Sequence, residues 1–145
     1  MKKKILVALD NSGYATKVMQ QALEMAKLYQ AELFGVSVFD DSWLVDESSP
    51  YAADTLSYLS ISYQAILDQC AKLAKEEETN VDYSHKTLKG NPAEEIIKYA
   101  EQEGVAVIVM GHLGKSAESG ASGFPIGSVA LKVATYSKCS VYIVK

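Results

Sequence analysis

Short, almost wholly apolar runs alternate along this 145-residue chain with longer segments whose apolar residues recur every three or four positions. Five runs have the length and content of strands buried in a parallel sheet, and they occupy residues 4–9, 32–39, 81–88, 105–110 and 140–144. The spacing between them is typical of helices with one buried face. A βα unit repeated four times and closed by a strand predicts a single α/β domain over residues 1–145. Its sheet should be open, five-stranded and mostly parallel, with helices on both faces.

Turn and capping residues mark the expected helix boundaries. The first helix is predicted over residues 15–30, after the chain-breaking sequence Asp-Asn-Ser-Gly. The second is predicted over residues 59–78, where it ends in a run of charged residues. The third has a strong start signal, because Asn91 can act as N-cap and Pro92 fits the first helical position. We expect it to end at Gly104.

The strand expected over residues 81–88 alternates apolar and polar residues, which indicates one exposed face and a place at the sheet edge. His85 lies in this strand without histidine or cysteine neighbours, and we interpret it as structural or solvent-facing. Gly35 weakens the second strand slightly, because glycine has no side chain to pack.

The segment from Asp40 to Asp54 is polar and acidic and shows no clear period. It is long for a connection within a compact domain. We interpret it as a mobile loop, with a lid or a partner surface as the alternatives.

Composition limits the possible partners. The chain is 48% hydrophobic and 22% charged, which is ordinary for a globular protein. Its net charge of −4 argues against nucleic-acid binding, which normally requires a basic face. No stretch approaches the roughly 18 apolar residues of a membrane helix. We therefore expect neither a nucleic acid nor a membrane as partner.

Two further features favour the cytoplasm. The apolar run after the three N-terminal lysines ends at Asp10, which is too short for a secretory signal. Cys70 and Cys139 lie far apart and form no C-x-x-C pattern, so a disulfide framework or a zinc site is not expected. We interpret both cysteines as buried apolar residues in a reducing compartment.

The stretch from Val105 to Val129 joins a strand, a glycine-containing loop and a helix start. Backbone N–H groups at a helix N-terminus have no partner within the helix and carry partial positive charge, so such a junction attracts anions. Glycines allow close approach of the main chain and a positive φ. Neither G-x-G-x-x-G nor the Walker spacing is present, so a plain connector is the alternative.

An acidic residue and this loop are expected at the same edge of the sheet. Asp10 follows the first strand, and Gly111 to Gly114 follow the fourth. In open parallel sheets, ligands bind beyond the carboxyl ends of the strands where the strand order reverses. If the first and fourth strands are neighbours at that reversal, both features line one crevice.

Five segments of the chain resemble the universal stress protein family, and the resemblance covers its whole length. They are I-L-V-A-L-D-N-S, G-N-P-A-E-E-I-I, V-I-V-M-G-H-L-G, G-S-V-A-L-K-V and C-S-V-Y-I-V-K. The resemblance implies a Rossmann-like fold of the adenine nucleotide alpha hydrolase type. It also implies the pattern G-x-x-G, nine-residue spacer, G-[ST] of the family's ATP-binding members.

The chain matches both ends of that pattern and departs from it between them. Gly111 and Gly114 match the glycine pair, and Gly127 with Ser128 matches the end. The spacer, residues 115–126, has twelve residues instead of nine, and Lys115 is its only basic residue. Extra length can bulge outward at little entropic cost. Triphosphates normally gain from Lys or Arg partners, so both ATP and AMP remain candidate ligands.

The resemblance implies an adenine nucleotide site made of three groups of residues. Asp10 and the main chain of Val38 would contact the ribose and the base, and Met110 and Gly111 would pass beneath the nucleoside. The remaining members would surround the phosphates, and they are His112, Gly114, Gly127, Ser128 and Val129.

Each of these assignments has a plainer alternative. Asp10 can instead cap the first helix, and Ser128 can cap the last. His112 can be an exposed loop residue. The side chains of Val38 and Met110 can simply belong to the core.

Three functions are compatible with these residues. The first is a cytoplasmic stress-response or signalling protein that binds ATP or AMP, with or without Mg²⁺, and acts as a regulatory dimer. The second is a dimer of the same family that binds no nucleotide and works through protein contacts. The third is a slow ATPase, although no catalytic constellation can be derived from the spacing of residues. We favour binding over catalysis.

The last strand, within the segment from Cys139 to Lys145, is expected to form the dimer contact. An apolar strand at a sheet edge exposes unpaired backbone groups. In a two-fold dimer the strand can pair with its own copy, and the family's dimers resemble this arrangement. The alternative is that this strand is internal to the sheet or covered by a loop.

Overall fold

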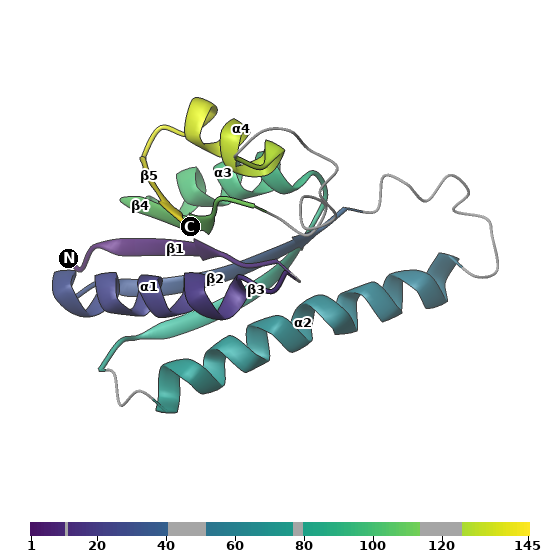
Figure 1. The fold of residues 1–145 in the computed structure, drawn as a ribbon, viewed down its shortest axis with the longest axis horizontal. Helices are drawn as coiled ribbons and strands as arrows, with labels where there is room; N and C mark the ends of the chain where they lie inside the picture. Colours follow the sequence, from purple (N-terminus) through teal and green to yellow (C-terminus); the bar gives the residue numbers. More distant parts are fainter. Residues whose placement is uncertain (11, 41–51, 77–79, 114–125) are drawn as a thin grey trace.

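The computed structural model describes residues 1–10, 12–40, 52–76, 80–113 and 126–145. Strands and helices alternate throughout these residues (Figure 1). In chain order they are β1 (Lys4–Ala8), α1 (Ala15–Tyr29), β2 (Glu32–Phe39), α2 (Ala52–Glu76), β3 (Tyr83–Lys89), α3 (Pro92–Glu103), β4 (Val107–Gly111), α4 (Ser128–Tyr136) and β5 (Ser140–Val144).

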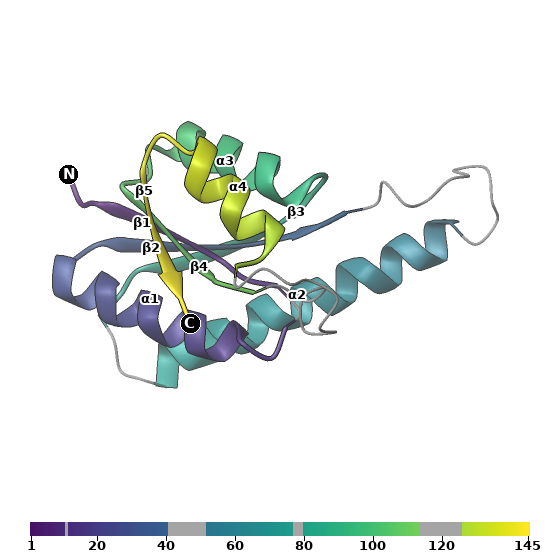
Figure 2. The ribbon, with the colours of Figure 1, turned by 45° about the horizontal axis from the view of Figure 1, so that its top comes forward.

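The five strands form one parallel sheet in the order β3-β2-β1-β4-β5. Helices α1 and α2 cover one face, and α3 and α4 cover the other (Figures 1 and 2). Each face has its own core, one built around Met19, Leu23 and Leu67 and the other around Ile96, Ile108 and Val133. The predicted α/β class, strand number and two-sided helix arrangement are therefore confirmed.

The ends of several strands differ slightly from the prediction. β2 and β5 have the expected bounds. β1 ends at Ala8, although the Leu9 amide still donates to the Val36 carbonyl at 2.8 Å. β3 and β4 both begin two residues later than expected, and β4 ends at Gly111. β3 lies at the edge of the sheet, as its alternating sequence predicts.

Helix α2 begins earlier than its sequence pattern predicts. It starts at Ala52, inside the segment that we interpreted as a loop, and Asp54 lies in its first turn. An acidic residue there interacts favourably with the positive end of the helix dipole. The interpretation is therefore wrong for residues 52–54, while residues 41–51 lie outside the described part of the chain. The start of α2 extends beyond the end of the sheet (Figure 2).

His85 joins β3 to α2, which agrees with a structural role. Its Nε2 lies 3.3 Å from the Gln64 side-chain nitrogen and 3.6 Å from a carboxylate oxygen of Asp68. The Thr87 hydroxyl donates to the other end of the Gln64 amide at 2.9 Å. These contacts fix the middle of α2 against the edge strand.

Both cysteines are free thiols, as expected, but only one is buried. Burial raises the pKa of the Cys70 thiol to about 11. Cys139 is half-buried and packs against the core beneath α3 and α4, so the prediction that both cysteines are buried is wrong for Cys139.

Gly35 creates the space that the Tyr83 side chain occupies. A Cβ atom added at Gly35 would overlap the Tyr83 ring and would meet its hydroxyl first. That hydroxyl is buried and has no hydrogen-bond partner in the described part of the protein. Desolvation by burial, followed by the charges of Cys70 and Asp68, raises the pKa of Tyr83. The glycine is therefore required by cross-strand packing as well as being a weak strand former.

We predict that Gly35→Ala lowers the free energy of unfolding by about 1–3 kcal/mol, because the added methyl group overpacks this contact. The loss should be smaller in a Tyr83→Phe background, where the closest atom has been removed. Urea unfolding of the four proteins in this double-mutant cycle measures the coupling. Equal losses in both backgrounds would contradict the contact.

Candidate functional site

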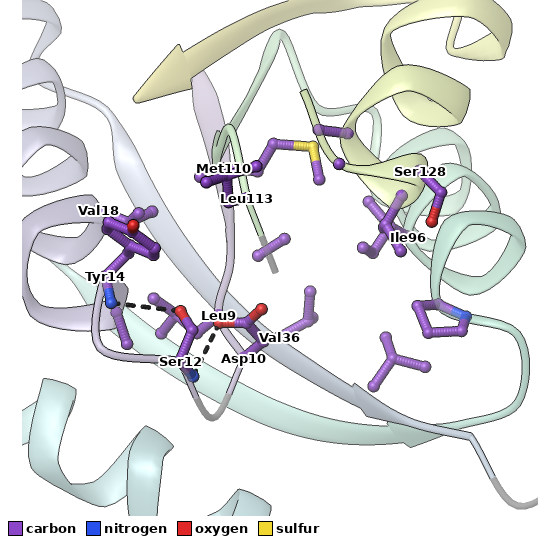
Figure 3. A pocket seen from close by; sticks show the side chains of 18 of the residues that line it. Leu9, Asp10, Ser12, Tyr14, Val18, Val36, Ile96, Met110, Leu113 and Ser128 are labelled. Atoms are coloured by element: carbon purple, nitrogen blue, oxygen red, sulfur yellow. Dashed lines mark hydrogen bonds between the residues drawn. The ribbon is translucent and has the colours of Figure 1, made fainter. Parts of the chain in front are cut away.

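The reversal of strand order lies between β1 and β4. These strands are parallel neighbours, with Ile5, Leu6 and Val7 opposite Val107, Ile108 and Val109. Beyond their carboxyl ends is a cavity of about 450 Å³ (Figure 3). Asp10, Gly111 and Gly127 all line it. The expected crevice between Asp10 and the glycine-containing loop is therefore present.

Asp10 closes a turn after β1 and also lines the cavity. Its Oδ1 accepts a hydrogen bond from the Ser12 amide at 3.1 Å, and the Ser12 hydroxyl accepts one from the Tyr14 amide at 3.2 Å (Figure 3). The N-cap of α1 is Tyr14, which has no side-chain cap bond. The alternative that Asp10 serves only as a helix cap is therefore wrong.

Helix α4 presents its first turn to the same cavity. Its N-cap is Gly127, and Ser128 is the first helical residue, so the alternative role of Ser128 as a cap is also wrong. The Gly127 amide donates to the His112 carbonyl at 2.6 Å, so this N–H group is already engaged. The next three amides, those of Ser128, Val129 and Ala130, have no partner within the helix, and their residues line the cavity.

His112 lies at the junction of β4, β5 and α4, and it is not among the residues that line the cavity. Its amide donates to the Val144 carbonyl at 2.9 Å, and its Nδ1 lies 3.2 Å from the same oxygen. The Tyr14 ring meets the imidazole edge-on at 5.5 Å. The next residue, Leu113, lines the cavity instead.

Two glycines at the ends of the loop, Gly111 and Gly127, lie among the described residues. Gly127 has φ −69° and ψ 157°, which any residue can adopt, and the described glycines with positive φ are Gly90 and Gly104. A Cβ atom at Gly111 would lie 3.4 Å from both the Leu113 carbonyl oxygen and a Val18 methyl group. Neither Gly111 nor Gly127 therefore uses the positive φ that glycine permits. Gly114 and residues 115–125 lie outside the described residues.

The floor of the cavity is apolar. Val38 and Met110 are 7% and 5% exposed, and both belong to the core beneath α3 and α4 as well as to the cavity lining. Val36, Ile96 and Val18 complete this surface (Figure 3). A flat apolar ring can therefore be buried here with little loss of hydrogen bonding.

Four polar residues that were not predicted also line the cavity, and they are Ser12, Tyr14, Asp40 and Tyr63. The Tyr63 ring packs against Phe39, with the ring centres 5.9 Å apart. Burial raises the pKa of the Tyr63 hydroxyl, and the negative charges of Asp10 and Asp40 raise it further. The alternation Val36, Val38, Asp40 is a signal that could have identified Asp40, because this residue continues the alternation of Val36 and Val38 one step past the end of β2.

The described lining contains two carboxylates and no Lys, Arg or His side chain. The positive potential on this lining therefore comes from the main chain at the start of α4. Among the described residues, no three His, Cys, Asp or Glu side chains gather in a way that could hold a metal ion. No helix in the same part of the chain has the length and hydrophobicity needed to cross a bilayer.

The chain is similar to known proteins over its whole length. It is 33% identical to a universal stress protein of Methanocaldococcus jannaschii over 144 residues, which is 99% of this chain and 82% of that protein. It superimposes on the universal stress protein UspA of Lactobacillus plantarum with a TM-score of 0.80 and 24% identity, covering 99% and 97% of the two chains.

Two solved structures with the same fold were determined with nucleotides. One is a universal stress protein in complex with cAMP, with a TM-score of 0.69, 20% identity and coverage of 99% and 96%. The other is the universal stress protein of Archaeoglobus fulgidus in complex with dAMP, with a TM-score of 0.70, 18% identity and coverage of 100% and 98%. The sequence model of the Universal stress protein family matches residues 1–145, and the chain therefore belongs to this family.

Proposed function

We propose that this protein binds an adenine nucleotide, ATP or AMP, in the cavity beyond β1 and β4 and acts as a regulatory or signalling dimer in a stress response. The observation that carries the proposal is that the first turn of α4 and the Asp10 carboxylate line one cavity. The two free cysteines support a reducing, cytoplasmic compartment.

The phosphate end of the ligand belongs at α4. The amides of Ser128, Val129 and Ala130 can donate to phosphate oxygens, and the helix dipole adds positive potential at the same place. The Ser128 hydroxyl supplies a further donor. Gly127 leaves space for the phosphate to approach the main chain. His112 contributes to the phosphate end indirectly, because its carbonyl accepts a hydrogen bond from the Gly127 amide and so positions the start of α4.

The nucleoside end belongs over the apolar floor. The Asp10 carboxylate can accept hydrogen bonds from ribose hydroxyls, and the main chain of Val38 can read the base. Met110 and Gly111 pass beneath the nucleoside. The cAMP and dAMP complexes of proteins with this fold support the choice of an adenine nucleotide.

The dimer contact belongs at β5, which lies at the end of the sheet opposite β3. The Val144 carbonyl accepts a hydrogen bond from the His112 amide, which follows β4. The backbone N–H and C=O groups of Val144 therefore face β4. Because these groups alternate along a strand, those of Val141 and Ile143 face the outer edge. That edge can pair with a second copy of itself around a two-fold axis.

We predict that AMP binds without a divalent cation, whereas Mg²⁺ raises the affinity for ATP by about tenfold or more. The described lining is acidic, and the cation neutralises the charge of the triphosphate. Isothermal titration with ATP, ADP and AMP, with and without Mg²⁺, measures this difference. An absence of both binding heat and thermal stabilisation at millimolar nucleotide would remove nucleotide binding from the proposal and leave a dimer that works through protein contacts. Phosphate-release assays on the same samples test for slow ATP hydrolysis.

Gly127→Val should lower nucleotide affinity at least tenfold, because its side chain would fill the space that the phosphate requires. The backbone at this position suits valine, so circular dichroism should show a folded protein. Gly127→Ala is the graded control and should weaken binding less. Unchanged AMP affinity in Gly127→Val would exclude α4 as the phosphate site.

Val141→Pro should weaken dimerisation by roughly tenfold to a hundredfold, because each subunit loses one outward-facing N–H donor. Val141→Thr is similar in size and keeps that donor, so it should behave like the wild type. Sedimentation equilibrium measures the dissociation constants of the three proteins. A monomeric wild type, or a Val141→Pro protein that dimerises as strongly as the wild type, would contradict the proposed interface.

A further inference from the structure

One wall of the cavity is acidic. Asp10 follows β1, Asp40 follows β2, and both line the cavity together with Tyr63 of α2. Both carboxylates lie close enough to the Tyr63 hydroxyl for their charges to raise its pKa, after the larger effect of burial. We call Asp10, Asp40 and Tyr63 the acidic wall. Figure 3 shows Asp10 and Ser128 on different sides of the cavity, so Asp10 and the first turn of α4 lie on separate surfaces.

Strand order decides which part of a nucleotide meets each carboxylate. The strands run β2-β1-β4 across the sheet, with neighbours about 4.8 Å apart. A phosphate at α4, which follows β4, places the adjoining ribose near the end of β1 and Asp10. The base then extends to the end of β2, where Val38 and Asp40 both line the cavity. Asp40 is therefore at the base end and Asp10 is at the sugar end.

Ionised carboxylates accept hydrogen bonds and cannot donate them. Asp40 can therefore pair with the exocyclic amine of an aminopurine, whereas the carbonyl of an oxopurine would bring a second acceptor towards it. Its two oxygens offer about four acceptor positions, so an existing contact leaves capacity for a ligand. The partly buried surroundings of Tyr63 and Phe39 strengthen such an interaction by excluding water.

We propose that Asp40 determines base specificity in this cavity by accepting a hydrogen bond from the exocyclic amine of a 6-aminopurine nucleotide and by disfavouring 6-oxopurine nucleotides. The inference rests on the proposed function, because it presumes a nucleotide with its phosphate at α4. In this proposal the base is recognised by the Asp40 side chain as well as by the main chain of Val38.

AMP and IMP provide the test, because IMP carries a carbonyl in place of the exocyclic amine. Isothermal titration of the wild type should show AMP binding at least about tenfold more tightly than IMP. In Asp40→Asn the side-chain amide can donate as well as accept. AMP should then bind more weakly, IMP more tightly, and the two affinities should agree within about threefold.

Asp54→Asn is the matched control. Asp54 is exposed in the first turn of α2 and does not line the cavity, so the same change of charge should leave the AMP to IMP ratio at its wild-type value. Thermal unfolding of each variant establishes that it is folded at the titration temperature.

These measurements distinguish a failure of the role of Asp40 from a failure of nucleotide binding. A wild-type ratio near one, or an Asp40→Asn ratio equal to that of the wild type, would overturn the role of Asp40 while leaving adenine nucleotide binding in place. If wild-type protein binds neither AMP nor IMP at millimolar concentration, the proposed function fails and the inference fails with it.

Discussion

The parallel pairing of β1 with β4 is the constraint on which the rest of this structure depends. Strands adjacent in sequence pair on either side of it, but this pair joins the two halves of the chain. Because the two strands are parallel, the loops that follow them begin at the same edge of the sheet. Asp10 and the start of α4 therefore lie close together there, although more than a hundred residues separate them. The buried valine, leucine and isoleucine side chains of these strands fix the register and therefore the place of the cavity.

The cavity has opposite polarity at its two sides. Main-chain amides at α4 carry partial positive charge, whereas Asp10 and Asp40 carry negative charge, and an apolar floor lies between them. The proposed ligand matches this polarity, with an anionic end at α4 and a flat ring over the apolar floor whose hydrogen-bond donors face the carboxylates. This combination is more selective than the fold, which many functions share.

The sequence was sufficient to predict the order of elements, because each strand and helix carries its own hydrophobic period. β2 and β5 have their predicted bounds since turn residues or a change of period mark both ends. The start of α2 was missed because residues 52–58 have no clear apolar stripe, and helix formation there depends on the rest of a long helix.

Site residues were predictable where the backbone alone places them. Asp10, Gly111 and Gly127 line the cavity because they lie just after β1, at the end of β4 and at the N-cap of α4, all at one edge of the sheet. The direction of the His112 ring was not predictable, because it depends on bonds to Val144 at the far end of the chain. Tyr63 reaches the cavity through the packing of α2 against Phe39, which is a tertiary contact with no local sequence signal.

The bond between the Gly127 amide and the His112 carbonyl has a consequence for how this protein can vary among its relatives. It clamps the two ends of the connection between β4 and α4, independently of the residues between them. Insertions or deletions in that connection can therefore accumulate without displacing the first turn of α4, at an entropic cost that rises only logarithmically with length. The geometry of the first turn of α4 is thereby insulated from the length of the connection that precedes it.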